Sequence, residues 1–77
     1  MERQEILNKL QTVYRDVLDD ENIVLTEDTT ADDIEEWDSL THVQIVAEIQ
    51  KVFGVKFSAK EMLLWESVGD IIDAIEG

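Results

Sequence analysis

The sequence predicts an all-α protein, a small four-helix bundle built from three longer helices and one short helix. Apolar residues recur at spacings of three and four in three segments, and no stretch shows the alternation of a half-buried strand. Capping residues and a glycine bound the segments. The 77 residues are enough for one domain only, so we expect a single domain over residues 1–77, with a long ordered loop between helices 1 and 2.

The first helix is predicted over residues 3–18, and the acidic run at residues 19–22 ends it. Its apolar positions follow the helical period and define one inward face. They are Ile6, Leu7, Leu10, Val13, Tyr14, Val17 and Leu18.

Residues 19–38 form the predicted loop, which is polar and rich in acids. A structureless connection of this length is uncommon in a compact domain, so we expect its apolar residues to hold it on the core. These residues are Ile23, Val24, Leu25, Ile34 and Trp37. The segment from Thr30 to Asp33 is predicted to form a short helical turn.

The second helix is predicted over residues 39–53, with Asp38 as its N-cap and Gly54 as its C-terminal stop. Its apolar residues cover more than half of the helix circumference, which indicates a central helix contacted from several sides. They are Leu40, Val43, Ile45, Val46, Ala47, Ile49, Val52 and Phe53.

Two further helices follow. Ser58 and Glu61 have the spacing of a capping box, which opens a short helix predicted to run through Trp65. Ser67 and Asp70 form a second cap for the last helix. Its inward residues are Val68, Ile71, Ile72 and Ile75.

Charge and composition exclude several classes of function. Nineteen Asp and Glu against six Lys and Arg give a net charge of −13, which disfavours nucleic acid and anionic membranes and favours partners with basic surfaces. The chain has no cysteine, hence no disulfide, thiolate metal site or thiol nucleophile. It shows no signal-peptide pattern and no apolar run of membrane-spanning length, so we expect a cytoplasmic protein without membrane insertion.

Ser39 is the main candidate for chemistry, because it begins an amphipathic helix in a domain too thin to enclose a deep site. One interpretation is a residue chosen for capping. The other is a modified serine whose attached phosphate faces free backbone N–H groups and the positive end of the helix dipole. The carboxylate of Asp38 opposes an anion there, and spacing alone does not decide between the two.

Two other kinds of site fail on the residues present. Ser39 and His42 are neighbours on one helix face, but nothing supplies an oxyanion hole, and we expect His42 to be a solvated helix residue. A calcium loop starting at Asp28 would need glycine where Asp33 stands and glutamate where Ser39 stands. We therefore predict no catalytic residue and no metal site.

The segment DSLTHVQIVAEIQKVFGV, residues 38–55, together with the helix order, acidity and length, resembles the acyl carrier proteins over essentially the whole chain. The resemblance implies that Ser39 carries 4′-phosphopantetheine, donated from coenzyme A by a phosphopantetheinyl transferase. The thiol of this arm would hold acyl groups as thioesters, so the reactive sulfur arrives on the cofactor. The chain would be a carrier and not an enzyme, with the second helix as its recognition surface.

The resemblance also implies roles for further residues. Partner enzymes, such as a ketosynthase, an acyltransferase or an acyl-ACP ligase, would recognise Asp38, Leu40, Val43, Gln44, Ala47 and Lys51. The acyl chain would enter between the helices along Ile49, Met62, Leu64, Trp65 and Ile72. A monomer is expected of a shuttle.

The sequence also departs from the housekeeping fatty-acid carrier. Thr41, Gln44, Gln50 and Lys51 stand where that carrier displays acids, and Trp37 replaces a small residue. We take this as a hint of a specialised carrier, for example in a polyketide or surface-polysaccharide pathway, while fatty-acid synthesis stays among the pathways considered and the cargo is left open. The alternatives are an aminoacyl, D-alanyl or peptidyl carrier, and an unmodified acidic helical adaptor.

Overall fold

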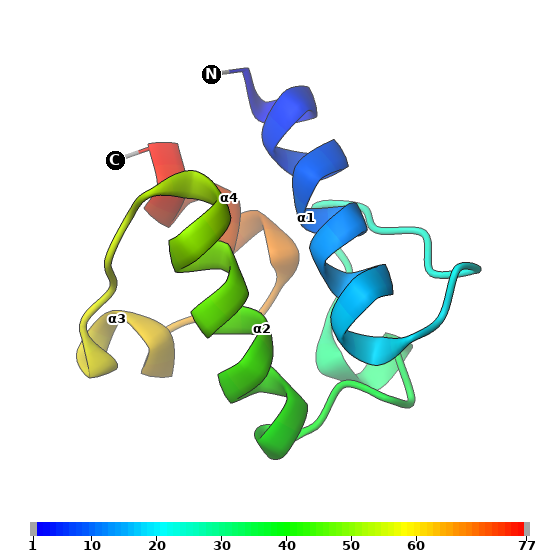
Figure 1. The fold of residues 1–77 in the computed structure, drawn as a ribbon. Coiled ribbons are helices and arrows are strands. Elements are labelled where there is room, and N and C mark those ends of the chain that lie inside the picture. Colours follow the sequence, from blue (N-terminus) through cyan, green and yellow to red (C-terminus); the bar gives the residue numbers. More distant parts are fainter. Residues whose placement is uncertain (1, 77) are drawn as a thin grey trace.

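The computed structural model describes residues 2–76 and confirms the all-α bundle (Figure 1). Within those residues there are four α-helices, one 3₁₀ turn and no strand. The elements are α1 (Arg3–Leu18), η1 (Ala31–Asp33), α2 (Ser39–Phe53), α3 (Ala59–Leu63) and α4 (Val68–Glu76). Helix α1 packs against α2 and α4, and α3 lies on the other side of α2 from α1 (Figure 1). None of these helices combines the length and the apolarity that crossing a bilayer requires.

Helix α1 has the predicted bounds. It ends because Asp19 adopts the left-handed conformation, with φ 52°, and donates its backbone N–H to the carbonyl of Arg15. The predicted inward face is buried at Ile6, Leu10 and Val13 and also at Tyr14.

The 19–38 loop is held on the core by four of the five apolar residues expected to do so. Ile23, Leu25, Ile34 and Trp37 are buried, whereas Val24 is 69% exposed, so the prediction for Val24 was wrong. Successive side chains of an extended segment point in opposite directions, and Val24 therefore faces away from the core between two buried neighbours.

Hydrogen bonds from two helices fix the same loop. The amide oxygen of Gln11 in α1 accepts the backbone N–H of Leu25 at 3.0 Å. The backbone N–H of Gly69 in α4 donates to the carbonyl of Glu27 at 2.8 Å. A Cβ atom on residue 69 would lie 2.9 Å from that carbonyl oxygen, so the close approach of loop and helix requires glycine.

Helix α2 also has the predicted bounds and caps. The carboxylate of Asp38 accepts the N–H groups of Leu40 and Thr41, each at 2.9 Å, and Gly54 ends the helix with φ 66°. The expectation that α2 is contacted from several sides holds in part, because α1 packs against one side and the ring of Trp65 meets His42 on another. Its buried residues are Ile45, Val46 and Ile49. Leu40, Val43, Ala47 and Val52 are exposed, and Phe53 is partly buried against the core.

Helix α3 is shorter than predicted. The capping box of Ser58 and Glu61 is present, but the helix ends at Leu63 and not at Trp65. The N–H of Leu64 bonds to the carbonyl of Glu61 at 3.1 Å, and that of Trp65 bonds to Met62 at 3.3 Å. These bonds span three residues, so the last turn tightens and the chain leaves the helix. The cap of α4 forms in part: the carboxylate of Asp70 accepts the N–H of Ser67 at 3.2 Å, while the N–H of Asp70 donates to the backbone carbonyl of Ser67 and not to its hydroxyl.

A single apolar core joins the loop with α1, α2 and α4. Its buried members are Ile6, Leu10, Val13, Tyr14, Ile23, Leu25, Ile34, Trp37, Ile45, Ile49, Val68, Ile71 and Ile72. The hydroxyl of Tyr14 is buried without a hydrogen-bond partner, and burial raises the pKa of this phenol. It is the one polar side-chain atom, among the described residues, that is enclosed in this way.

Arg3 ties the first turn of α1 to the loop and to α4. Its guanidinium pairs with Asp73 at 2.6 Å and also with Glu27 and Glu76. The hydrogen bonds of Glu27 and Asp73 raise the pKa of Arg3, and the guanidinium in turn lowers the pKa of Glu27. In a chain of net charge −13, one cation thus neutralises acids from two distant segments.

Candidate functional site

Ser39 is exposed and is the first residue of α2, which begins at the end of the bundle far from the start of α1 and the end of α4 (Figure 1). Its hydroxyl makes no hydrogen bond to another group of the described chain, so the oxygen is free to react. The residues on either side, Asp38 and Leu40, are also exposed.

The free N–H groups expected at the start of α2 are largely used by the protein itself. The Asp38 carboxylate takes those of Leu40 and Thr41, and the Asp38 carbonyl takes that of His42 at 2.8 Å. The Thr41 and Leu40 N–H groups hold the pKa of Asp38 below its usual value, so this carboxylate is charged. The helix end therefore offers a phosphate only the N–H of Ser39, and the predicted anion site is not preformed.

Thr41 fixes the chain that enters the helix. Its hydroxyl accepts the N–H of Asp38 at 2.8 Å and donates to the carbonyl of Glu36 at 2.9 Å. Because these bonds hold the backbone before and after Ser39, the serine has a defined direction although its own side chain is unrestrained.

Behind Ser39 lies a row of rings that we call the aromatic wall: Tyr14, Trp37, His42, Trp65 and Phe57. Trp37 packs edge-on against Tyr14, with ring centroids 4.9 Å apart, and stacks on His42 at 5.9 Å. The ring of Trp65 meets His42 edge-on at 6.2 Å and Phe57 at 4.8 Å. No sequence pattern predicted this row, because its members come from α1, the loop, α2 and the segments on both sides of α3.

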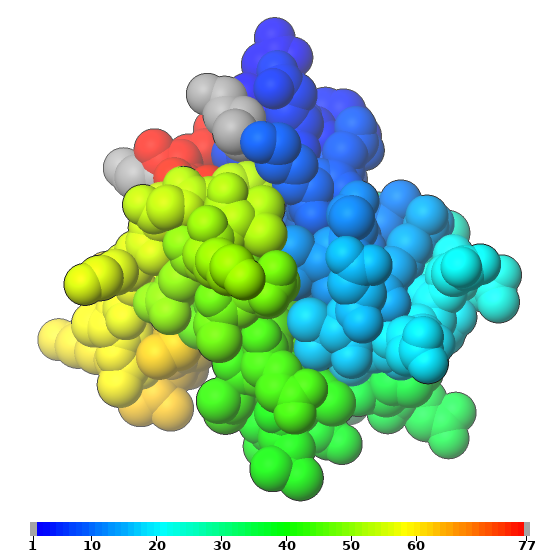
Figure 2. Space-filling view, viewed as in Figure 1, coloured from blue at the N-terminus to red at the C-terminus, as the bar shows by residue number. Residues whose placement is uncertain are grey.

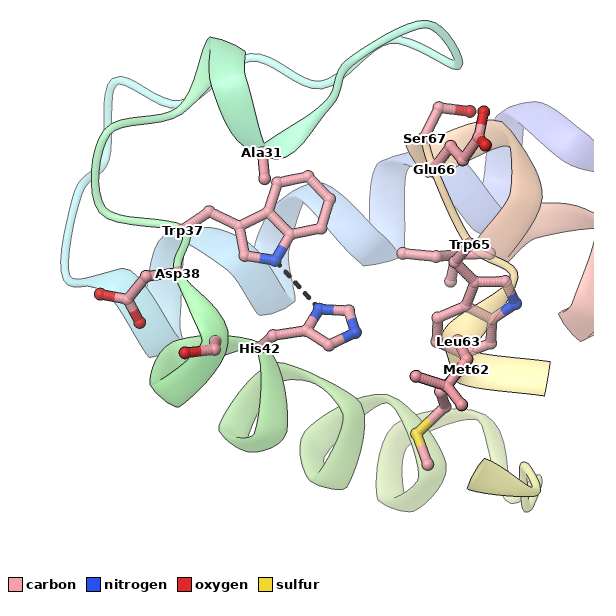
Figure 3. Close-up of a pocket in the computed structure, with 11 residues that line it drawn as sticks. Ala31, Trp37, Asp38, His42, Met62, Leu63, Trp65, Glu66 and Ser67 are labelled. Carbon is pink, nitrogen blue, oxygen red and sulfur yellow. Dashed lines mark hydrogen bonds between the residues drawn. The ribbon is translucent and has the colours of Figure 1, made fainter. Parts of the chain in front are cut away.

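A hydrogen bond inside the aromatic wall sets the protonation of His42. The indole Nε1–H of Trp37 donates to His42 Nδ1 at 3.0 Å (Figure 3). Nδ1 is therefore an acceptor, and the neutral ring carries its proton on Nε2. Burial lowers the pKa of His42, in agreement with a neutral imidazole.

This geometry settles two earlier points about His42. The expectation of a solvated histidine was wrong, since the ring is partly buried between two indoles. A Ser39–His42 nucleophilic pair is also unsupported. With Nδ1 bonded to Trp37 and Nε2 protonated, the ring has no free basic nitrogen to take the proton of the Ser39 hydroxyl.

A cavity of about 370 Å³ opens beside Ser39, between the start of α2 and the segment from α3 to α4 (Figure 3). Its walls are largely apolar and include three members of the aromatic wall, with the His42 ring between Trp37 and Trp65. The remaining lining residues are Ala31, Asp38, Met62, Leu63, Glu66, Ser67 and Ile71.

The structure places the five residues expected along an acyl-chain route in three different environments. Met62 and Trp65 line the cavity beside Ser39. Ile49 and Ile72 are fully enclosed in the core and do not line that cavity. Leu64 is 71% exposed and lines a different hollow, together with residues of α4.

The six residues expected to meet partners are all exposed, and five of them lie on α2, which runs down the front of the molecule in Figure 2. Leu40 is 77% exposed and Val43 is 69% exposed, so α2 presents to solvent a strip of residues that is partly apolar. The spacing of three and four from Leu40 to Lys51 puts the strip on one face of the helix. Its members are Leu40, Val43, Gln44, Ala47 and Lys51, with Asp38 just before the helix.

Comparisons with known proteins agree with this geometry. The family described as "Phosphopantetheine attachment site" matches residues 8–75. An acyl carrier protein of Coprothermobacter proteolyticus is 31% identical over 78 residues, covering 99% of this chain and 93% of the relative. One from Rubrobacter xylanophilus is 33% identical, covering 97% and 93%. The solution structure of a holo acyl carrier protein from Geobacter metallireducens superimposes with a TM-score of 0.85 at 37% identity, covering 91% of this chain and 80% of that one.

Proposed function

The chain belongs to the acyl carrier proteins, and from that premise we propose that Ser39 is the residue that bears its 4′-phosphopantetheine arm. It is a carrier and not an enzyme. When bound, the arm supplies a thiol that holds acyl groups as thioesters, which the protein's own cysteine-free sequence cannot do.

The position of Ser39 is the observation that carries the proposal. The serine is exposed, its hydroxyl is free, and Thr41 and Asp38 hold the backbone on both sides of it. The arm fits the surroundings, because an apolar cavity with a few polar groups starts beside the serine. A phosphoester needs no preformed anion site, since a covalent bond holds it.

The exposed strip on α2 is the proposed docking surface for the phosphopantetheinyl transferase and for acyl-transfer enzymes. Leu40, Val43 and Ala47 supply apolar contact, and Asp38 adds a charge beside the modified serine. Gln44 and Lys51 replace acids, so steering by basic partner surfaces rests more on the acidic loop and termini than on α2. Which ketosynthase, acyltransferase or acyl-ACP ligase uses this surface stays open.

An acyl chain would enter by the cavity between α2 and α3. Met62 and Trp65 lie at its opening, and the core residues Ile49 and Ile72 lie behind them. Reaching that depth requires α3 to move, which costs little because none of its five residues is buried. Leu64 would take part only through such a movement.

For the pathway, we propose only a general class. The scarcity of acids on α2 and the presence of Trp37 favour a specialised carrier over the housekeeping carrier of fatty-acid synthesis. Polyketide synthesis or the acylation of a surface polysaccharide are such pathways, and an aminoacyl, D-alanyl or peptidyl cargo is the alternative. A cytoplasmic location and a monomeric state stay predictions.

Intact mass tests the site. The protein is incubated with coenzyme A, magnesium and a broad-specificity phosphopantetheinyl transferase. We expect a gain of one phosphopantetheine in the wild type and none in Ser39→Ala. Ser58→Ala is the matched control, because Ser58 also stands at the start of an exposed helix and should leave the gain unchanged. A folded wild type that gains nothing from two different transferases would leave the unmodified adaptor as the remaining interpretation.

A further inference from the structure

His42 directs a hydrogen-bond donor into the cavity. Because Trp37 occupies Nδ1, the proton of the neutral ring is on Nε2, the nitrogen on the far side of the ring. In Figure 3 this nitrogen faces the space between α2 and α3, where Met62 and Trp65 lie. No acceptor for it is present in the described part of the chain, so the donor is available to a ligand.

The surroundings of this donor define the ligand. Trp37, Trp65 and Met62 provide apolar walls, while Asp38 and Glu66 at the cavity disfavour an anion. A neutral group that combines apolar carbon with a carbonyl or hydroxyl oxygen satisfies both conditions. Ser39 also borders the cavity, and His42 is one helical turn away from it, so a group attached to the serine is already within reach.

The part of the arm nearest its phosphate has this chemistry, with a dimethyl carbon, a hydroxyl and an amide. We propose that His42 is a positioning residue for the arm of the unloaded holo protein, donating Nε2–H to a hydroxyl or amide oxygen of the arm. The dimethyl carbon then lies against Trp37 and Trp65. The inference rests on attachment at Ser39, and it makes the resting arm a group folded onto the protein rather than one extended into solvent.

Nuclear magnetic resonance of the ¹⁵N-labelled protein tests the contact without any acyl transfer. Apo and holo forms, distinguished by intact mass, are compared through the ring nitrogens of His42 and through cross-relaxation between the arm methyl groups and the two indoles. We expect the His42 Nε2 resonance to shift on conversion to holo and the methyl–indole cross-peaks to appear.

Variants separate the donor from the cavity shape. His42→Phe keeps a ring but removes the donor, and the methyl–indole cross-peaks should be lost. His42→Gln retains an amide that can accept from Trp37 and donate to the arm, and it should restore them in part. Val52→Ala, an exposed change on the same helix outside both the cavity lining and the exposed strip, should leave them unchanged.

Two results would overturn the inference. In the first, the wild-type holo protein shows neither the His42 shift nor the cross-peaks, which means that the arm is free. In the second, both signals arise only after the arm is loaded with a butyryl group, which makes the cavity a cargo site alone. A failure to gain phosphopantetheine is a separate result, visible in the mass, and would remove the proposed function as well.

Discussion

The two sides of α2 are built differently. Toward α1 and α4, the helix buries Ile45 and Ile49 in an aliphatic core from which solvent is excluded. Toward α3, the aromatic wall meets a cavity, and its central residue, His42, is only partly buried and hydrogen-bonded. One side thus holds the helix in place, while the other borders the cavity proposed to receive the group at Ser39. The two roles can therefore be disturbed separately.

The largest expected effect on stability comes from a change on the side of α2 that faces α1 and α4, which we call the aliphatic side. Ile49→Ala should lower the free energy of unfolding by about 2–5 kcal/mol, because it removes enclosed apolar contacts and leaves a cavity. Denaturant unfolding measures this loss. Val43→Ala, on the exposed strip of the same helix, should change the stability by less than about 0.5 kcal/mol. Equal losses in the two variants would contradict the division between the sides of α2.

Tyr14 belongs to both sides, since it lies in the core and packs against Trp37. Tyr14→Phe should raise the free energy of unfolding by about 1 kcal/mol, because it removes a buried hydroxyl without a partner and keeps the ring. Thermal and denaturant unfolding check the sign. A loss of stability instead would show that the hydroxyl has a partner, such as a buried water.

The smallest expected effect on the free energy of unfolding comes from His42 in the aromatic wall, and it depends on pH. The pKa of His42 is lowered by burial, so the unfolded chain binds this proton more tightly than the folded one. The contribution of His42 is thus fully present above the unfolded pKa, about 6.5, and is lost as the pH falls toward the folded pKa. Unfolding of the wild type and of His42→Gln at several pH values isolates this contribution from the acids.

Trp37→Phe sharpens the same test. It removes the indole N–H that occupies Nδ1, so the nitrogen becomes free to take a proton and the pKa of His42 should rise. Titration of the ring by nuclear magnetic resonance measures the change. If the wild-type His42 titrates above its ordinary value, the bond from Trp37 to Nδ1 does not hold the ring neutral, and the tautomer inferred from that bond is refuted.

The sequence predicted the aliphatic side well and the aromatic side poorly. The bounds of α1 and α2 follow from local periodicity and from the capping residues Asp38 and Gly54, all of which act within a few positions. The end of α3 was overestimated, because apolar residues continue past the point where the backbone tightens. The prediction that Val24 contacts the core was wrong, because successive side chains of an extended segment point in opposite directions. With Ile23 and Leu25 buried, Val24 points toward solvent.

Some parts of the candidate site could likewise be predicted from the sequence and others could not. Ser39 and the exposed strip could be identified from a motif and a helical face. The bond between Trp37 and His42 could not, because it joins an irregular segment to a helix and follows no period. The cavity could not be predicted from the sequence either. It depends on where the chain leaves α3 and on how it then places Trp65 beside His42 of α2.

Arg3 brings the beginning of α1 and the end of α4 together, and Ser39 lies at the opposite end of the bundle (Figure 1). Another protein domain joined before α1 or after α4 would emerge on the side that faces away from the serine. The fold can therefore be tethered at either end, or at both, without crowding Ser39, the proposed attachment residue. Such a layout suits insertion into a longer polypeptide as well as free diffusion between enzymes.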